Sequence, residues 1–441
     1  MVVKATKISA SAAVHRVDPD RWWDEFGALL DRIRPRFSRF EPARHAGGMV
    51  QGLLSGLERK NCWTIAEFLG HRDPEALQHL LSRAKWDDVG VGEDLLAYVL
   101  DAFNDPAGIL AVDETGDLKK GIRTVATQRQ YTGTAGRIEN AQVAVYLTYT
   151  APRGHALIDR ALYLPQSWVQ DPERRAAAGV PADAAFATKP ALALRMIGDA
   201  LDAGAAASWV TGDEVYGNDP ALRAGLQHRR AGYVLAVSCD HRIPTNGGPV
   251  RADSVARGLP PTCWQRLSAG VGSKGHRMYS WAYLQLPATD DGHSWILMRR
   301  NDSTGELAYY RCFQKNRVPL HELVRVAGQR WTIEESFQAA KGQAGLDEHQ
   351  VRTWTSWHRW TVLCMLAMAF LAVVTATERD RTPTPDDLIP FTLNEIRRLF
   401  DALTVGPIGR TQDHVLRWSN WRRRHQATAR KCHYRSRSEH P

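Results

Sequence analysis

Two short apolar runs, each ending on an aspartate, constrain the fold of this 441-residue chain more than any other feature. They are residues 108–113, GILAVD, and residues 208–213, SWVTGD. Runs of this length and composition, bounded by turn residues, are typical of buried β-strands. In open sheets, functional groups gather beyond the carboxyl ends of the strands. Asp113 and Asp213 are therefore expected to lie close together if their strands are neighbours in one sheet.

The segments around these two runs predict the rest of the sheet. Residues 142–149 and 156–164 have the composition of two further strands. A helix over 190–203 precedes the second run, and a helix over 220–229 and a strand over 233–238 follow it. The order is three strands, helix, strand, helix, strand, which predicts an α/β fold: a mixed sheet with helices on its faces.

The regions on either side of this core predict the domain organisation. Residues before the first strand have helical patterning, whereas Gly- and Pro-rich sequence with short β-like runs interrupts the core before helices resume near residue 320. We expect a helical N-terminal, DNA-binding domain over 1–105, a core over 106–239 and 316–375, a β-rich insertion over 240–315, and a C-terminal helix with a basic tail over 376–441. The insertion's Trp264, Trp281 and Trp295 could stack an unpaired base or, as is commoner for tryptophan, pack in a core.

The N-terminal region contains a candidate DNA-reading motif. Apolar residues recur at helical spacing from Trp22 to Ile33, which predicts a first helix. Further on, a short helix over 64–69 ends at Gly70, and Asp73-Pro74 begins a helix over 75–83. The pattern resembles a helix-turn-helix, although any pair of antiparallel helices has the same pattern.

The charge of the chain predicts a polyanionic partner. The net charge is +9, from 57 Lys and Arg against 48 Asp and Glu, which suits nucleic acid, heparin-like polymers or an anionic membrane surface. Residues 410–437 hold nine Lys or Arg against one Asp. This tail could clamp phosphates, or it could be a solvated charged end.

Cysteine spacing and hydropathy favour a cytoplasmic protein. The six cysteines have no metal-ligand spacing and are too sparse for a disulfide scaffold, which favours a reducing compartment. No basic stretch followed by an apolar core begins the chain, so we expect no secretory signal. The apolar run over 361–375 is shorter than the roughly 20 residues of a membrane span, so we expect a buried core helix and no membrane partner.

A third acid lies on a helical segment that begins at Arg330, RWTIEESFQAAK. At about 100° per residue, Glu334 lies about 40° and Lys341 about 20° from Arg330 around the helix. One carboxylate is thus flanked by two bases, and Ile333 and Phe337 form an adjoining apolar stripe. The alternative is a surface ladder of ion pairs, which is common on exposed helices.

The neighbouring acid, Glu335, is the weaker candidate. It falls about 140° from Arg330 and three residues after Thr332, as in a capping box. If Thr332 caps the helix, Arg330 precedes it, but the alignment of Glu334 with Lys341 holds in both cases. A cap explains Glu335 locally, which leaves Glu334 as the candidate functional acid.

Three acids brought together would require a counter-charge. Taken alone, a strand-end aspartate more often satisfies backbone N–H groups in a turn. Clustered carboxylates repel one another, and hard divalent cations such as Mg2+ compensate them through oxygen ligands. Glu334 with its basic flanks favours a metal site formed with Asp113 and Asp213.

At these residues the sequence resembles bacterial insertion-sequence transposases of the DDE superfamily, in particular the insertion sequence 701 family. That family is related to the group whose third acid carries the signature Y-x2-R-x3-E-x6-K, matched here by Arg330, Glu334 and Lys341. The other similar blocks are VDETGDLKKG over 112–121, QYTGTAGRIENAQ over 130–142, GDEVYG over 212–217 and GLDEHQVR over 345–352. The resemblance extends over roughly residues 20–375, and it is specific as a set. The signature Tyr is missing, because Ala327 stands at its position, which puts the contacts with terminal DNA in doubt.

The resemblance implies a fold, a cofactor and a reaction. The fold would be RNase H-like, with helices on both faces and the β insertion between the second Asp and the Glu. Asp113, Asp213 and Glu334 would hold two Mg2+ ions, for which Mn2+ can substitute. The reaction would be cleavage at transposon ends, followed by transfer of the freed 3′-hydroxyl into target DNA.

The same resemblance implies the partners. Lys119 and Lys120 would hold phosphates, unless they are only a charge pair in a turn, and Arg330 and Lys341 would neutralise the DNA backbone. The substrates would be double-stranded DNA carrying the terminal inverted repeats and a target DNA. We expect a homodimer or larger assembly on DNA, in the bacterial cytoplasm and associated with the nucleoid.

Two other functions are compatible with the sequence. A metal-dependent nuclease that cuts without joining would use the same three acids. A domesticated transposase that serves as a DNA-binding regulator would not need them, so the presence of all three acids argues against it.

Overall fold

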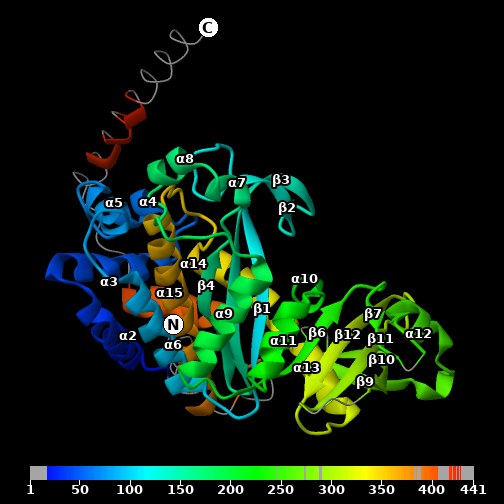
Figure 1. The fold of residues 1–441 in the computed structure, drawn as a ribbon. Helices are drawn as coiled ribbons and strands as arrows, with labels where there is room; N and C mark the ends of the chain where they lie inside the picture. Colours follow the sequence, from blue (N-terminus) through cyan, green and yellow to red (C-terminus); the bar gives the residue numbers. More distant parts are fainter. Residues whose placement is uncertain are drawn as a thin grey trace, which may run out of the picture. The chain divides into compact units, whose positions relative to one another are not determined.

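The computed structural model describes residues 17–245, 247–272, 275–287, 291–381, 384, 389–405, 417–419, 421–423, 425–426 and 428. The chain forms two compact units (Figure 1). The first comprises Met1–Val91, Lys341–Gln350 and Val362–Pro441, and the second comprises Gly92–Ala340 and Val351–Thr361. Three helices continue along the chain from one unit into the other: α6 (Asp88–Phe103), α14 (Trp331–Ala344) and α15 (Trp354–Arg381).

The first unit is helical, as expected for the N-terminal region. The remaining elements within it are α2 (Pro19–Ile33), η1 (Arg34–Arg36), α3 (Phe40–Leu54), α4 (Cys62–Phe68), α5 (Glu75–Ser82), α16 (Leu393–Phe400) and the π-helical turn η3 (Asp401–Val405). The α2 face that carries Trp22 and Phe26 is buried. Phe26 makes edge contacts with Phe370 and Phe400, with ring centroids 5.4 and 5.8 Å apart. Sequence far beyond the N-terminal region therefore completes this core.

The two short helices of the helix-turn-helix pattern form where the sequence predicts them. Asn61 begins α4 with a reciprocal capping box to Thr64, and Gly70 after its end has a φ of 78°, which favours glycine. Asp73 accepts a hydrogen bond from the Glu75 backbone N–H at 3.0 Å, although Pro74 occupies the capping position itself.

Part of the basic tail packs in the first unit. The Trp418 ring is only 1% exposed, and its Nε1 donates to the His71 carbonyl oxygen at 2.9 Å. Arg422 forms an ion pair with Glu67 at 2.8 Å. A wholly solvated tail would not make these contacts. The rest of the predicted basic tail, residues 410–416, 420, 424, 427 and 429–437, lies outside the described residues.

The second unit is built on a mixed sheet, as the α/β prediction required. Its strands are β1 (Gly108–Leu118), β2 (Gln128–Thr132), β3 (Arg137–Ala151), β4 (Gly154–Leu162), β5 (Ala207–Gly212), β6 (Gly232–Val237), β9 (Gln265–Gly272), β10 (Gly275–Gln285), β11 (His293–Arg300) and β12 (Leu307–Gln314). Their order is β2-β3-β1-β5-β6-β12-β11-β10-β9, with β4 also paired to β3 (Figure 1). The strands β7 (Arg242–Ile243) and β8 (Val250–Arg251) form a separate small pair.

Strand β1 lies between an antiparallel and a parallel neighbour. It pairs antiparallel with β3 and parallel with β5, and β5 pairs parallel with β6. Parallel neighbours need crossover connections, and α9 (Lys189–Asp202) and α11 (Pro220–His228) provide the helices. The first five residues of β1 are buried because the strand is internal to the sheet and helices cover its faces.

The β-rich segment extends this same sheet. Antiparallel pairing of β12 with β6 joins its four strands to the core. One face packs on α13 (Leu320–Gln329), the other on α12 (Ala252–Gly258). Trp281 and Trp295 are 1% and 2% exposed within these layers, so core packing is their role. Trp264 lies beneath the Arg300 guanidinium, 4.6 Å from its ring centroid. The remaining short elements are α7 (Gln166–Val169), α8 (Pro172–Ala177), α10 (Glu214–Gly217) and η2 (Pro261–Cys263).

The apolar run over 361–375 is the middle of α15, a helix of 28 residues. By length and composition α15 could cross a membrane, but 94% of its most apolar window is buried inside the protein. A mostly buried helix of this kind is what the core of a large domain requires. The prediction of a buried core helix is confirmed.

Candidate active site

Asp113 and Asp213 occupy the same level of two neighbouring strands. Val112 and Gly212 are partners in the parallel pairing of β1 with β5, and each aspartate is the next residue. Strand β5 ends there, but β1 does not. Its residues Glu114–Leu118 continue to pair antiparallel with β3, so the prediction that the first strand ends on Asp113 is wrong. Asp113 instead lies where the parallel half of the sheet stops.

Backbone amides hold both carboxylates. Asp213 is the N-cap of the short helix α10, and its Oδ1 accepts the Val215 N–H at 2.8 Å. The Oδ1 atom of Asp113 accepts the Glu114 N–H, also at 2.8 Å. These bonds satisfy one oxygen of each aspartate. They also agree with the capping role that a strand-end Asp commonly has.

Burial and like charges act together on these aspartates. Burial, followed by the charges of Asp213 and Glu114, raises the pKa of Asp113 to about 7, although Arg330 and the Glu114 amide oppose the shift. Burial and the Glu114 charge also raise the pKa of Asp213. A site in which carboxylates raise one another's pKa values accumulates negative charge that a cation can neutralise.

Arg330 connects the third predicted acid to the first. Its Nη2 lies 3.0 Å from Oε1 of Glu334, and its Nη1 lies 3.8 Å from Oδ2 of Asp113. Burial alone would lower the pKa of Arg330, but the charges of Glu334 and Asp113 outweigh it and raise the value. The structure therefore brings Glu334 to the same side of the sheet as Asp113.

Packing of α14 against the sheet explains this placement. Tyr146 on β3 is the antiparallel partner of Asp113, and its ring meets Phe337 edge-on at 5.5 Å. Ser336 forms a hydrogen bond with Nδ1 of His155 on β4 at 2.9 Å. The apolar stripe predicted for this helix faces the sheet. In this orientation the Glu334 side chain points along the surface of the sheet.

The choice of Glu334 over Glu335 agrees with this geometry, but one reason for it does not. Glu335 is exposed. Thr332, however, lies inside α14 and is buried, and its hydroxyl bonds to the Gln329 side chain at 3.0 Å. The capping box between Thr332 and Glu335 is therefore wrong, because the helix begins one residue before Thr332.

A fourth carboxylate, Glu114, was not predicted. It points to the opposite face of β1 from Asp113, as successive strand residues do. Its Oε1 accepts from Nζ of Lys189, the first residue of α9, at 2.6 Å. Its Oε2 accepts from the hydroxyl of fully buried Tyr216 at 2.7 Å. Glu114 and Tyr216 belong to the two blocks that carry the aspartates, and that placement was the only signal in the sequence.

The predicted basic residues have different surroundings. Lys119 follows β1 and lies 3.9 Å from Asp117, with a side chain only 12% exposed. Lys120 is exposed. Lys341 is half-buried in the part of α14 that belongs to the first unit. Lys120 is thus the most accessible of the three lysines.

Position 327, where the family signature has Tyr, faces a core. Ala327 is 8% exposed on α13 and belongs to the apolar cluster that includes Ala269 and Leu323. The next residue, Gly328, packs so closely that an added Cβ would lie 2.0 Å from the Ala269 carbonyl oxygen. A small side chain suits this contact between α13 and β9.

The acids suit a hard divalent cation by donor type. Asp113, Asp213 and Glu334 offer only carboxylate oxygens, which Mg2+ and Mn2+ prefer. As the described side chains stand, no three or more His, Cys, Asp or Glu converge to hold one ion. The positive charge that lies between Asp113 and Glu334 is instead that of the Arg330 guanidinium. The mutual repulsion of the aspartates shows that Arg330 compensates them only in part.

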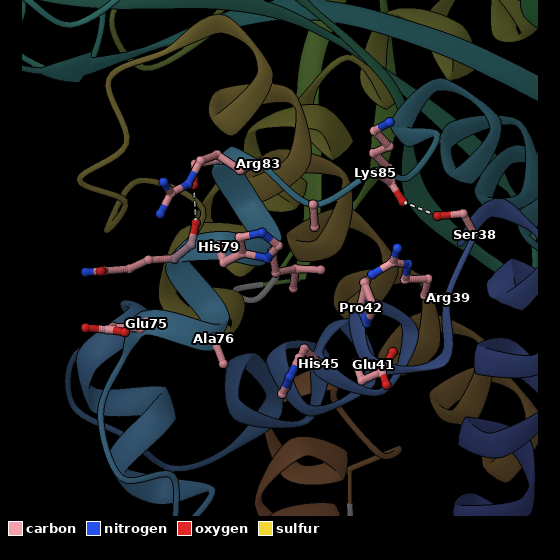
Figure 2. Close-up of a pocket in the computed structure, with 14 residues that line it drawn as sticks. Ser38, Arg39, Glu41, Pro42, His45, Glu75, Ala76, His79, Arg83 and Lys85 are labelled. Atoms are coloured by element: carbon pink, nitrogen blue, oxygen red, sulfur yellow. Dashed lines mark hydrogen bonds between the residues drawn. The ribbon is translucent and has the colours of Figure 1, made fainter.

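The first unit has an open cavity of about 1120 Å³ between α3, α5 and the residues that flank them (Figure 2). Ser38 closes one side through a hydrogen bond from its hydroxyl to the Lys85 carbonyl oxygen at 3.1 Å. The charged and polar residues that line the cavity include Arg39, Glu41, His45, Glu75, His79 and Arg83. The lining residues from α5 include Glu75, His79 and Ser82.

Comparison with known proteins places the chain in a family. Residues 32–290, more than half of the chain, match the family described as DDE superfamily endonuclease. The range includes Asp113 and Asp213 and ends before Glu334. A probable transposase for insertion sequence element IS701 from Microchaete diplosiphon is 27% identical over 223 residues, which are 50% of this chain and 54% of that protein. The chain thus matches about half the length of this curated relative. A solved piggyBac transposase synaptic complex with hairpin DNA has a TM-score of 0.39 and 10% identity, over 91% of this chain and 88% of that one.

Proposed function

Because this chain belongs to the DDE superfamily of endonucleases and is related to the IS701 transposase, we propose that it is a DNA transposase. It cuts at the ends of an insertion sequence and transfers the freed 3′-hydroxyl into target DNA. One observation carries the proposal: Asp113 and Asp213 lie at the same level of adjoining parallel strands, with Glu334 linked to Asp113 through Arg330. The core of the second unit is RNase H-like in this proposal, with the order β4-β3-β1-β5-β6.

Asp113, Asp213 and Glu334 would hold the two divalent ions, Mg2+ or Mn2+. When bound, such ions lower the pKa of a water molecule and stabilise the charge on the leaving 3′-oxygen. In cleavage, a bond forms between the water oxygen and phosphorus, and the bond from phosphorus to the 3′-oxygen breaks. In strand transfer, the freed 3′-hydroxyl replaces the water, so one phosphodiester replaces another and no external energy source is needed.

The protein's own residues orient the acids. Glu114 joins β1 to Lys189 of α9 and to Tyr216 of α10, and α10 begins at the cap formed by Asp213. This buried bridge ties the segment that carries Asp213 to the strand that carries Asp113. Partners of this kind fix the directions of metal-binding carboxylates.

Basic residues would position the DNA. Arg330 is shared between Asp113 and Glu334 and is 30% exposed, so it can turn towards a phosphate once cations compensate those acids. Lys119 and Lys120, beyond the end of β1, and Lys341 on α14 would contact the DNA backbone. Such contacts contribute affinity and register but carry no sequence information.

The helical first unit would supply most of the affinity for terminal DNA. The support is the pair of short helices α4 and α5 and the polar cavity beside α5, where Arg39, Arg83 and Lys85 supply positive charge (Figure 2). Arg422 of the tail, which packs beside α4 through its ion pair with Glu67, would extend this surface. Terminal inverted repeats and a target duplex are the proposed partners.

The test is a joining reaction. Purified full-length protein is incubated with Mg2+, a donor DNA carrying both element ends, and a target plasmid. Donor ends covalently joined to target would support transposition. Paired ends that are cut but never joined would support the nuclease alternative, and DNA binding without cleavage in Mg2+ or Mn2+ would support the regulator.

The protein–DNA complex in the same reaction can be used to test the oligomeric state. An element has two ends, so we propose a homodimer or larger complex with one protomer at each end. The molar mass of the protein–DNA complex, measured by light scattering, tests this directly. A single protomer bound to a joining-competent pair of ends would contradict it.

A further inference from the structure

Two arginines of the second unit carry positive charge that no acid neutralises by direct contact. Arg223 on α11 and Arg311 on β12 are both half-buried. Among the described residues, neither guanidinium forms an ion pair, although nearby arginines such as Arg229 do, with Asp202 at 2.8 Å. Charged groups that leave water are normally paired, because an unpaired buried charge costs considerable free energy. Two guanidinium groups without an acidic partner have the charge and the donors to bind an anion.

The strand register brings this charge to the edge of the sheet that carries the aspartates. Gly212 pairs with Leu235 on β6, and Leu235 pairs with Arg311 on β12. Arg311 is thus two strands from β5, about 10 Å across the sheet, one residue level before Asp213. It lies on the face that α11 covers, opposite to the face that carries Asp113.

Arg223 reaches the same edge from the helix side. Its Nη1 donates to the carbonyl oxygen of Gly217, the last residue of α10, which begins immediately after Asp213. Helix α10 packs directly on β6, since a Cβ added at Gly217 would lie 1.7 Å from the Ala236 carbonyl oxygen. The two arginines therefore approach the sheet edge from α11 and from β12.

Two buried polar atoms of this cluster have no hydrogen-bond partner. In the part of the chain that the structure describes, Nε of Arg311 and Nε2 of His241 are buried without a hydrogen-bond partner. Burial and the charge of Arg311 lower the pKa of Arg223, and burial with both arginines lowers the pKa of His241 to about 4. Asp219 and Asp240 act in the opposite direction but do not reverse either shift. The three side chains are thus close enough to repel charge from one another.

We propose that Arg223, Arg311 and His241 form a phosphate-binding site beside the catalytic edge, and that its occupant is a phosphodiester of the DNA strand. Guanidinium groups match phosphate because their planar N–H donors bind two oxygens at once. The identification of DNA as the source rests on the proposed function, whereas the affinity for phosphate does not. A backbone phosphate held here would fix the strand beside Asp213.

The first experiment measures thermal unfolding of the full chain in inorganic phosphate against chloride at equal ionic strength. The wild-type melting temperature should rise by about 2 °C at a phosphate concentration well above the dissociation constant. Arg311→Met should lose this rise. In phosphate-free buffer the same variant should melt no lower than the wild type, because it removes a buried charge that has no partner.

Two matched variants accompany it. Arg229→Met changes the net charge equally but removes a paired arginine, so it should keep the phosphate response. Arg311→Lys keeps the charge without the two-pronged donor, so it should keep part of the response. A wild-type protein that phosphate does not stabilise beyond chloride would overturn the proposal. So would an Arg311→Met protein that still responds fully.

The second experiment identifies the source of the phosphate. Binding of terminal DNA is measured against salt concentration, and removal of one phosphate-binding group should reduce the log–log slope by roughly 0.9 in Arg311→Met but not in Arg229→Met. A phosphate response with an unchanged slope would retain the site and refute DNA as its occupant. A protein that cleaves no DNA yet keeps the phosphate response would overturn the proposed function and leave the site standing.

Discussion

Charged groups in the first unit and at the sheet edge of the second unit have different surroundings. In the first unit, Lys60 is 3% exposed, and its Nζ and backbone N–H donate to the Gln343 carbonyl oxygen and to Glu348. Glu378 is 1% exposed and accepts from Nε1 of Trp22 at 2.9 Å. The Lys60 ammonium thus has a carbonyl acceptor, and the Glu378 carboxylate has a hydrogen-bond donor. Arrangements of this kind stabilise a fold and require nothing from outside.

At the sheet edge of the second unit, groups of the same charge are brought together. Burial and the charges of Asp213 and Glu114 raise the pKa of Asp113, and burial and the Glu114 charge raise that of Asp213. Two strands from β5, Arg311 lies near Arg223 of α11, and the charge of Arg311 helps to lower the pKa of Arg223 after burial. Such arrangements lower stability unless a ligand of opposite charge binds. We therefore distinguish groups that stabilise the fold from groups that we propose bind cations and phosphates, and variants of each kind test this distinction.

The largest effect is expected at Glu334. Glu334→Gln should reduce Mg2+-dependent cleavage on the order of 10³-fold or more, since it removes a ligand charge while leaving the side-chain shape. Binding of terminal DNA, measured by gel shift, should change little. The matched variant Glu335→Gln removes an exposed carboxylate and should leave cleavage unchanged. The reverse pattern would show that the acids at the sheet edge are not the catalytic set.

The buried, hydrogen-bonded Lys60 should behave differently. Lys60→Met leaves the Gln343 carbonyl oxygen without its donor, whereas Glu348 keeps the backbone N–H of residue 60, so the free energy of unfolding should fall by about 2 kcal/mol in urea denaturation. Cleavage per folded molecule should be retained. Loss of activity without loss of stability would break the distinction between the two regions.

Lys60 should also make stability depend on pH. Burial, with a further contribution from Arg397, lowers its pKa from 10.5 to about 8. Between these two values the unfolded lysine holds a proton that the folded one has lost, so this residue makes stability rise with pH. The difference in unfolding free energy between wild type and Lys60→Met should therefore grow from pH 8 to pH 10. A constant difference would contradict the shift.

The bridge at Glu114 should have an intermediate effect. Tyr216→Phe removes the hydroxyl that donates to Glu114 and should reduce cleavage about 10–100-fold, as loss of a partner to a metal-binding group does. The Mg2+ concentration for half-maximal activity should rise, which a purely structural loss would not cause. Tyr131→Phe, at a position 63% exposed, is the control. An unchanged Mg2+ requirement would limit Glu114 to a structural role.

The smallest effect is expected from the end of the basic tail. Trp418 and Arg422 pack in the first unit, so removing the whole tail would damage that core as well. Deleting only residues 429–441 removes four Lys or Arg and spares those interactions. If these residues bind phosphates, the log–log salt slope of DNA binding should fall by roughly 0.9 for each phosphate that the shortened protein no longer neutralises. An unchanged slope would identify this end as a solvated one.

Local sequence determined where the strands and helices of the core form. The apolar runs that lead to Asp113 and Asp213, and the stripe of Ile333 and Phe337, have the periodicity of buried elements. They became β1, β5 and α14. Strands β2 and β9 were missed because QRQYT and QRLSAGVG carry polar or small residues, as terminal strands of a sheet can.

Only the tertiary structure decided which side chains meet. Strand β1 runs on past Asp113 because β3 offers a partner, and Glu114 finds Lys189 and Tyr216 on two separate helices. Arg330 was predicted to flank Glu334, and the fold adds Asp113 as its second partner. The physical reason is that periodicity reports on burial within one element. Contacts between elements depend on register and packing, which residues distant in the sequence set jointly.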